Sequence, residues 1–147
     1  MRLFLGVDGG QSATTALIGD EAGRVLGAGR GGPCNHAGAA EGRRRLVLAV
    51  GDSVAAACAQ GNLDARAVGF AVACLGMSGG PEDKRAILQQ ILPAEVVVVT
   101  DDAVIALAGA TAGEPGIVTI AGTGSISFGR NRGTHRAHRR VGLHFRR

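Results

Sequence analysis

The chain has 147 residues, of which 46% are hydrophobic and 3% aromatic, and its formal net charge is +4. This length suits one compact domain, and the composition excludes a largely disordered chain; three cysteines without Cys-x-x-Cys spacing also exclude a disulfide framework and a cysteine metal cluster. We find neither a signal peptide nor a run of about 20 apolar residues, so we expect a cytoplasmic protein without a membrane span.

The first predicted element is a buried strand over residues 4–7 that ends in a carboxylate, Asp8. Gly9 and Gly10 follow, and a second strand over residues 14–18 returns from the turn. Glycines allow positive φ and let a polyanion approach the main-chain N–H groups, while the carboxylate and nearby hydroxyls suit Mg²⁺ and phosphate oxygens. The stretch predicts a phosphate-binding hairpin, and an ordinary glycine hairpin is the alternative with the same local pattern.

A third strand over residues 25–29 completes a predicted run of three antiparallel strands. Residues 27–32 fit the dinucleotide-binding pattern Gly-x-Gly-x-x-Gly, but Pro33 stands where a helix would start, so we interpret the match as accidental. In the loop that follows, Asn35 and His36 are the strong hydrogen-bonding side chains. By themselves they indicate only a turn residue and a surface residue.

Residues 39–60 have helical spacing, with apolar residues recurring every four positions. A buried strand is predicted over residues 68–75, and Ser78 lies just beyond its carboxyl end. Pro81 as a first helical residue predicts a short helix that runs to Leu92. Ligands bind at the carboxyl ends of strands in open α/β sheets, which makes Ser78 a candidate contact, although a serine before a helix is also common without any ligand.

Four consecutive valines predict a strand over residues 96–100 that ends in Asp101 and Asp102, followed by a helix over residues 103–112. A carboxylate in such a position is kept ionised by the helix dipole and by free N–H donors. One of the two aspartates could simply cap the helix, and Asp101 suits that role. Residues 113–116, Gly-Glu-Pro-Gly, break the chain, and we expect a boundary between lobes there.

The pattern of the first hairpin recurs at residues 117–128, where an apolar strand reaches Gly122, Thr123 and Gly124 and an alternating strand leaves the turn. With both hairpins, the sequence resembles the acetate and sugar kinase, heat-shock chaperone and actin superfamily. Within it, the chain is similar to the BadF/BadG/BcrA/BcrD ATPase family, which includes N-acetylglucosamine and glucosamine kinases. The two hairpins resemble the phosphate-1 and phosphate-2 motifs of that family, and the likeness extends from residue 2 to about residue 131.

The resemblance implies an α/β fold. We expect a ribonuclease-H-like or actin-like ATPase lobe over residues 1–113, with three antiparallel strands and then alternating helices and parallel strands, and the first hairpin of a second lobe over residues 114–131. The implied activity is ATP-dependent phosphorylation of an amino sugar. Its cofactors would be ATP and Mg²⁺, its partners would be small molecules, the sugar and ATP, and a homodimer is left open.

The resemblance also implies a role for each site residue. Asp8 would position Mg²⁺, Asp102 would take the proton from the sugar hydroxyl, and Asn35 and Ser78 would contact the sugar together with Asp102. The ATP phosphates would be bound by Gly9, Gly10, Gln11, Ser12, Thr14, Gly122, Thr123 and Gly124. Two residues depart from the family's usual Gly-Gly-Gly-Thr-Lys-Thr text: Gln11 replaces a glycine, and Ala13 replaces a basic residue that could contact phosphate.

The end of the chain differs in charge from the rest. Seven of the 16 basic residues lie in the last eighteen positions, so that residues 1–129 carry nine basic and twelve acidic groups, a net charge of −3. Read one base later, codons for residues 139–147 can encode Gly-Gly-Trp-Gly-Phe-Ile-Phe-Gly-Asp, a segment of the kind that follows this hairpin in the kinases. We expect a frameshift near residue 131, a disordered basic tail over residues 132–147 and an inactive fragment; the nucleotide sequence tests this.

Other functions fit parts of the pattern. An ATPase activator of an acyl-CoA dehydratase or reductase belongs to the same family, but such proteins have a different second hairpin and later cysteines for an iron–sulfur cluster, and no cysteine follows Cys74 here. A nucleic-acid-binding module could use the basic tail. A carboxylate-metal nuclease could use Asp8, but it would need more carboxylates than the chain clearly offers. We do not expect nucleic acid to be a partner.

Overall fold

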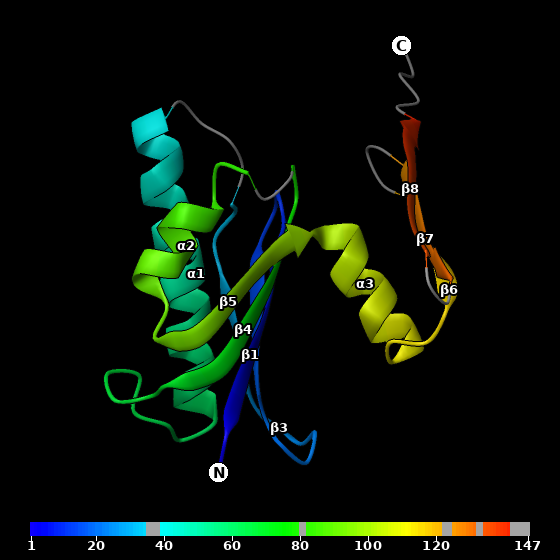
Figure 1. The fold of residues 1–147 in the computed structure, drawn as a ribbon. Helices are drawn as coiled ribbons and strands as arrows, with labels where there is room; N and C mark the ends of the chain where they lie inside the picture. The colour runs from blue at the N-terminus through cyan, green and yellow to red at the C-terminus, as the bar shows by residue number, and fades with distance from the viewer. Residues whose placement is uncertain (35–38, 80–81, 122–124, 132–133, 142–147) are drawn as a thin grey trace. The chain divides into compact units, whose positions relative to one another are not determined.

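The computed structural model describes residues 1–34, 39–79, 82–121, 125–131 and 134–141. The chain divides into two compact units, Met1–Asp102 and Ala103–Arg147. The first unit holds a five-stranded sheet of order β3-β2-β1-β4-β5 with two helices, and the second holds a three-stranded sheet of order β6-β7-β8 (Figure 1). This division falls after the first residue of helix α3 (Asp102–Thr111), whereas the expected boundary followed residue 113.

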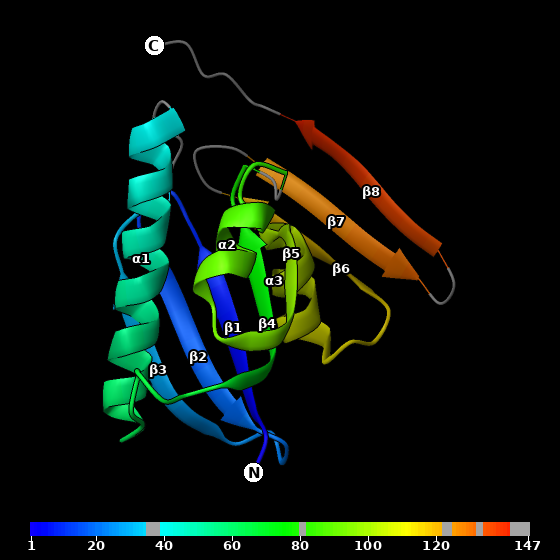
Figure 2. The ribbon, with the colours of Figure 1, turned by 60° about the vertical axis from the view of Figure 1, so that its left-hand side comes forward.

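The first unit has the predicted order of three antiparallel strands and then alternating helices and parallel strands. Its strands are β1 (Leu3–Gly9), β2 (Thr14–Asp20), β3 (Val25–Gly31), β4 (Phe70–Met77) and β5 (Ala94–Asp101). Strands β1, β2 and β3 pair antiparallel, and β4 and β5 extend the sheet parallel to β1. Helices α1 (Ala39–Gln60) and α2 (Arg85–Ile91) cover the same face of the sheet (Figures 1 and 2).

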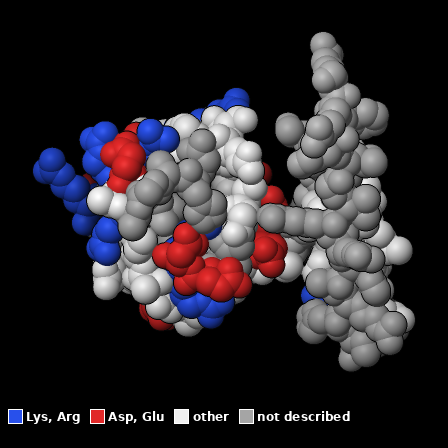
Figure 3. Space-filling view, turned by 90° about the horizontal axis from the view of Figure 1, so that it is seen from above, with Lys and Arg blue, Asp and Glu red and all other residues white. Residues whose placement is uncertain are grey.

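The core of the first unit lies between this sheet face and α1. The predicted repeat is confirmed, because Leu46, Val50, Val54 and Cys58 are all buried, with at most 9% of their surface exposed. The opposite side of α1 carries three exposed arginines, residues 43–45. Figure 3, which looks down on the first unit, shows basic side chains gathered on the side where α1 lies. The arginine run is therefore a solvated helix face, as predicted.

Helix α2 is shorter than predicted. It begins at Arg85, four residues after the expected start at Pro81, and residues 82–84 form a turn. Lys84 in this turn is only 4% exposed, and its ammonium lies 3.1 Å from the Asp83 carboxylate. Burial of a lysine is a tertiary effect, which the local proline signal for a helix start does not contain.

Strand β3 packs unusually close to α1 through glycines at every second position. A Cβ added to Gly27, Gly29 or Gly31 would lie 2.1–2.2 Å from a backbone oxygen of α1. Real Cβ atoms do not approach backbone that closely, so only glycine fits at these three positions. The Gly-x-Gly-x-x-Gly match therefore lies mostly within a strand and serves helix packing.

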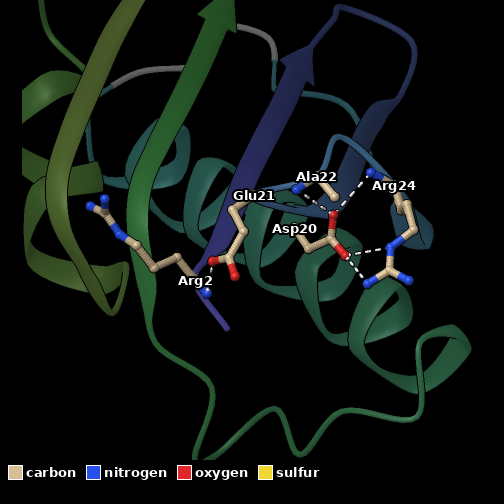
Figure 4. Close-up of polar contacts among 5 residues, drawn as sticks. All are labelled: Arg2, Asp20, Glu21, Ala22 and Arg24. Carbon is tan, nitrogen blue, oxygen red and sulfur yellow. Dashed lines mark hydrogen bonds and ion pairs between the residues drawn. The ribbon is translucent and has the colours of Figure 1, made fainter.

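The turn between β2 and β3 is organised by one buried carboxylate (Figure 4). Asp20 accepts hydrogen bonds from the main-chain N–H groups of Ala22 and Arg24, at 2.9 and 3.0 Å, and pairs with the Arg24 guanidinium at 2.6–2.7 Å. The hydrogen bond from the Arg24 side chain, followed by those from the main chain, lowers the pKa of Asp20 from its ordinary value. Beside it, Glu21 accepts a hydrogen bond from the main-chain N–H of Arg2, which ties the turn to the start of β1.

Replacing Asp20 with asparagine is expected to lower the Tm at pH 7. A carboxyl whose pKa is lowered in the folded state stabilises that state above its unfolded pKa, and this contribution is lost as the pH falls through the folded pKa. The Tm difference between wild type and Asp20→Asn should therefore shrink below about pH 4. Thermal unfolding followed from neutral to acid pH measures this, with Asp52→Asn, an exposed position on α1, as the control. A Tm difference that stays constant with pH would contradict the expectation.

The second unit consists of α3 and an antiparallel sheet. Its elements are α3 (Asp102–Thr111), which begins with the last residue of the first unit, β6 (Gly116–Ala121), β7 (Ser125–Asn131) and β8 (Thr134–Val141). Gly113, with φ of +86°, turns the chain from α3 into β6, and a Cβ on Gly116 would lie 2.7 Å from Cγ2 of Thr111. The break predicted over residues 113–116 is therefore a tight helix-to-strand turn.

Residues 134–141, which lie within the expected disordered tail, form strand β8. These residues pair antiparallel with β7, so the hairpin of β6 and β7 has a third strand. Pairing uses main-chain N–H and C=O groups, which every residue type but proline offers, so a strand can form without an apolar side-chain pattern. In the described parts of both units, no helix is long and apolar enough to cross a bilayer.

Candidate active site

The carboxyl ends of the three parallel strands meet at one edge of the first sheet. The register pairs Asp8 of β1 with Gly76 of β4, and Gly76 with Thr100 of β5. Asp102 follows β5 directly, as the first residue of α3. Ser78 lies at the same edge, where its main-chain N–H donates to the Gly9 carbonyl oxygen at 3.0 Å. The predicted site residues of this unit that the structure describes therefore lie at one edge.

The hairpin between β1 and β2 closes with a tight turn. The Gly10 N–H donates to the Ala13 carbonyl oxygen at 3.0 Å, which leaves Gln11 and Ser12 exposed at the tip. Neither Gly9 nor Gly10 adopts the positive φ that glycine allows. Gly9 is instead closely packed: a Cβ there would lie 2.4 Å from Sδ of Met77, so the Met77 side chain would have to move. The tip presents polar groups to solvent, as a phosphate-binding turn would.

Thr14 faces the helices and not the exposed side of the hairpin. Its side chain is fully buried, and its hydroxyl donates to the Gly32 carbonyl oxygen at 2.8 Å and lies 2.8 Å from Sγ of Cys34. Burial raises the pKa of the Cys34 thiol, so this contact is made by a neutral group. The Thr14 hydroxyl thus ties the hairpin to the loop before α1, and its phosphate contact stays a prediction.

Asp8 lies on the other face of the sheet and is exposed there. Partial removal of its carboxylate from water, and secondly the negative charge of Asp102, raise the pKa of Asp8. The two carboxylates are thus close enough for their charges to repel. A cation or a proton bound between them would relieve this repulsion, which is the electrostatic setting of a metal or acid–base site.

The structure distinguishes the two neighbouring aspartates. Asp101 pairs with Met77, one register position beyond the pairing of Thr100 with Gly76. Because side chains alternate along a strand, Asp101 belongs to the opposite face of the sheet from Asp8. Asp102 is the aspartate whose charge acts on Asp8.

Two hydroxyl residues of this edge were given no site role from the sequence, which named Thr15 only as one of the hydroxyls near the hairpin tip. Thr15 pairs with Asp8 across β1 and β2, and Thr100 lies in the same row two strands away, so both share its face. The turn that closes between Gly10 and Ala13 could have identified Thr15, because it fixes which residues of the hairpin are opposite. Thr100 had no such signal, since the register of parallel strands is set by tertiary packing.

Part of the predicted site lies outside the described residues, namely Asn35, Gly122, Thr123 and Gly124, so their sugar and phosphate contacts stay predictions. Within the described part of the chain, no cluster of three or more His, Cys, Asp or Glu side chains could bind a metal ion. Asp8 and Asp102 offer carboxylate oxygens alone. This donor set fits Mg²⁺, which commonly takes one or two carboxylates and completes its shell with phosphate oxygens and water.

Comparison with known proteins agrees with this picture. The model of the BadF/BadG/BcrA/BcrD ATPase family matches residues 5–141. The N-acetyl-D-glucosamine kinase of Dictyostelium discoideum is 30% identical over 88% of this chain and 44% of its own length. The glucosamine kinase GspK of Vibrio cholerae is 33% identical over 87% of this chain and 43% of its own.

Solved structures show the same fold. A Chromobacterium violaceum protein assigned as an N-acetylglucosamine kinase superposes with a TM-score of 0.76 at 28% identity, over 92% of this chain and 48% of that one. A ROK family glucokinase from Streptomyces griseus, solved with glucose and AMPPNP, gives 0.62 at 25% identity, over 96% and 48%. The chain thus spans a little under half the length of these relatives. Because the family model matches nearly the whole chain, including both hairpins and the edge that carries the two aspartates, the chain belongs to the BadF/BadG/BcrA/BcrD ATPase family.

Proposed function

We propose that this chain serves the ATP-dependent phosphorylation of an amino sugar, glucosamine or N-acetylglucosamine. The observation that carries the proposal is the pair of interacting carboxylates, Asp8 and Asp102, at the carboxyl edge of the sheet beside an exposed glycine hairpin. The two amino-sugar kinases among its relatives support the substrate class. Because both of these relatives are amino-sugar kinases, we favour this function over that of an ATPase activator.

Each part of the edge has a role in this proposal. The exposed turn around Gln11 and Ser12 would receive the phosphates, and Thr14 would support the turn from behind through its bond to the Gly32 carbonyl. Asp8 would hold Mg²⁺, through water, and the bound ion would neutralise charge on the phosphate oxygens. Asp102 would accept the proton of the attacking sugar hydroxyl.

The remaining predicted contacts complete the proposal. Asn35 and Ser78 would orient the sugar, and Gly122, Thr123 and Gly124 would approach the phosphates from the second hairpin. Phosphoryl transfer depends mainly on positioning and charge neutralisation, so these contacts would matter as much as the base. A cytoplasmic location is a further prediction, made from the sequence without a signal peptide or an apolar run, and a homodimer stays open.

The proposal is tested with the purified chain, by calorimetric binding of AMPPNP with and without Mg²⁺ and by an assay for sugar phosphate. We expect binding that needs Mg²⁺ and that Asp8→Asn weakens by at least about tenfold. Binding that is indifferent to both Mg²⁺ and Asp8 would contradict the proposal. From the chain's coverage of its relatives we expect no turnover by the 147 residues alone; formation of sugar phosphate would correct that expectation and support the kinase assignment.

A further inference from the structure

Arg30, which has no role in the proposed site, lies in line with Asp8 across the strands of the sheet. Arg30 of β3 pairs with Thr15 of β2, and Thr15 pairs with Asp8 of β1. Residues paired across neighbouring strands share a face, so Arg30 belongs to the face that carries Asp8. With strands spaced about 4.8 Å apart, the two residues start about 10 Å from each other, a gap that an arginine side chain and a phosphate group together can bridge.

The side chain of Arg30 is available for a ligand. It is exposed, and among the described residues its guanidinium makes no hydrogen bond or ion pair. Other arginines of the first unit are engaged: Arg24 pairs with Asp20, and Arg85 donates to the Val99 carbonyl oxygen at 3.1 Å. Arg30 thus combines a position beside the candidate site with a free, planar set of donors that suits phosphate oxygens.

Arg30 also offers a positive charge that the hairpin between β1 and β2 does not carry. The hairpin carries no basic residue between Asp8 and Thr15, and Thr14 is buried on the helix side. Ala13 directly precedes β2, and the alternation of that strand continued by one residue would give it the face of Thr15 and Arg30. Arg30 is a diagonal cross-strand neighbour of position 13, and such neighbours are within reach of long side chains. Its guanidinium can occupy the region that a basic side chain at position 13 would have occupied.

We propose that Arg30 binds the terminal phosphate of the nucleotide and supplies the positive charge that Ala13 lacks. The inference rests on the proposed function and extends it, by naming the residue that favours a nucleoside triphosphate over a diphosphate. A guanidinium in this role strengthens binding most when the outermost phosphate is present, because that group carries the most charge and extends farthest from the nucleoside.

The test compares the affinities of the purified chain for Mg²⁺-AMPPNP and Mg²⁺-ADP by calorimetry. Arg30→Gln is expected to weaken AMPPNP binding by about tenfold or more and ADP binding by less than about threefold. Arg30→Lys should recover part of the loss, since it restores the charge without the planar fork. Arg66→Gln, at an exposed position in the connection between α1 and β4, is the matched control and should change neither affinity. Adding Ala13→Lys to Arg30→Gln should restore AMPPNP binding.

The outcomes distinguish a failure of the role of Arg30 from a failure of the proposed function. Unchanged AMPPNP affinity in a folded Arg30→Gln protein, or equal losses for AMPPNP and ADP, would overturn the role of Arg30 and leave the proposed function in place. A loss of the same size in Arg66→Gln would also overturn it, because the effect would then be one of net charge. If the wild-type chain bound neither nucleotide, the proposed function would fail along with the inference.

Discussion

Changing Asp102 to asparagine is expected to slow sugar phosphorylation by about 10²–10⁴-fold and to leave nucleotide affinity nearly unchanged. Asparagine keeps the size and the hydrogen-bonding shape of the side chain, but it cannot accept the proton of the attacking hydroxyl. Asp102 stands at the start of α3, close enough to Asp8 for its charge to raise the pKa of that carboxyl. Removing this charge should therefore also lower the pKa of Asp8 toward its ordinary value.

Two measurements check this expectation. The first is the initial rate of sugar phosphate formation in a chain that turns over, either this one or a chimera with the remaining half of the Vibrio cholerae relative. The second is an NMR titration of Asp8 in wild type and Asp102→Asn, which needs no turnover. Asp101→Asn is the control, because its register position belongs to the opposite face from Asp8. Full turnover in a folded Asp102→Asn protein would refute the role of Asp102 as general base.

Replacing Gly29 with alanine is expected to lower the free energy of unfolding by about 3 kcal/mol, a large effect for one added methyl group. The new Cβ would lie 2.2 Å from the Ser53 oxygen and 2.3 Å from the Ala57 nitrogen, both on the backbone of α1. Backbone atoms of a helix cannot rotate away as a flexible side chain can. Helix α1 would have to move away from β3, and the close packing of α1 against Gly27 and Gly31 would be lost as well.

Urea denaturation measures this loss. Equal m-values in the variants would show that unfolding exposes the same amount of surface in each. Gly6→Ala is the matched control, since it adds the same methyl group to a central strand where nothing lies within 4 Å of the new Cβ. Gly6→Ala is expected to be neutral or slightly stabilising, because alanine restricts the unfolded chain. If Gly29→Ala were as stable as Gly6→Ala, β3 could not pack against α1 as described here.

Much of the first unit follows from local patterns. The four-residue repeat of apolar side chains predicts α1 at its observed bounds, and the valine run predicts β5 to within two residues. Strand-to-turn transitions at Asp8 and Asp102 also predict which carboxylates stand at strand ends. These features depend on neighbours along the chain, whose spacing relative to the helix or strand period can be read from residue types alone.

Contacts between distant segments decided the rest. Thr14 turns inward because Gly32 and Cys34 offer it buried partners, and the side chain of Met77, from another strand, packs closely against Gly9. β8 forms because the edge of β7 offers unpaired main-chain groups, whatever side chains follow it. The residue types alone therefore predicted the order of the elements from β1 to β7 and singled out the two aspartates of the candidate site. Only the tertiary structure showed which faces those residues share, because strand register and helix packing depend on atoms far apart in the chain.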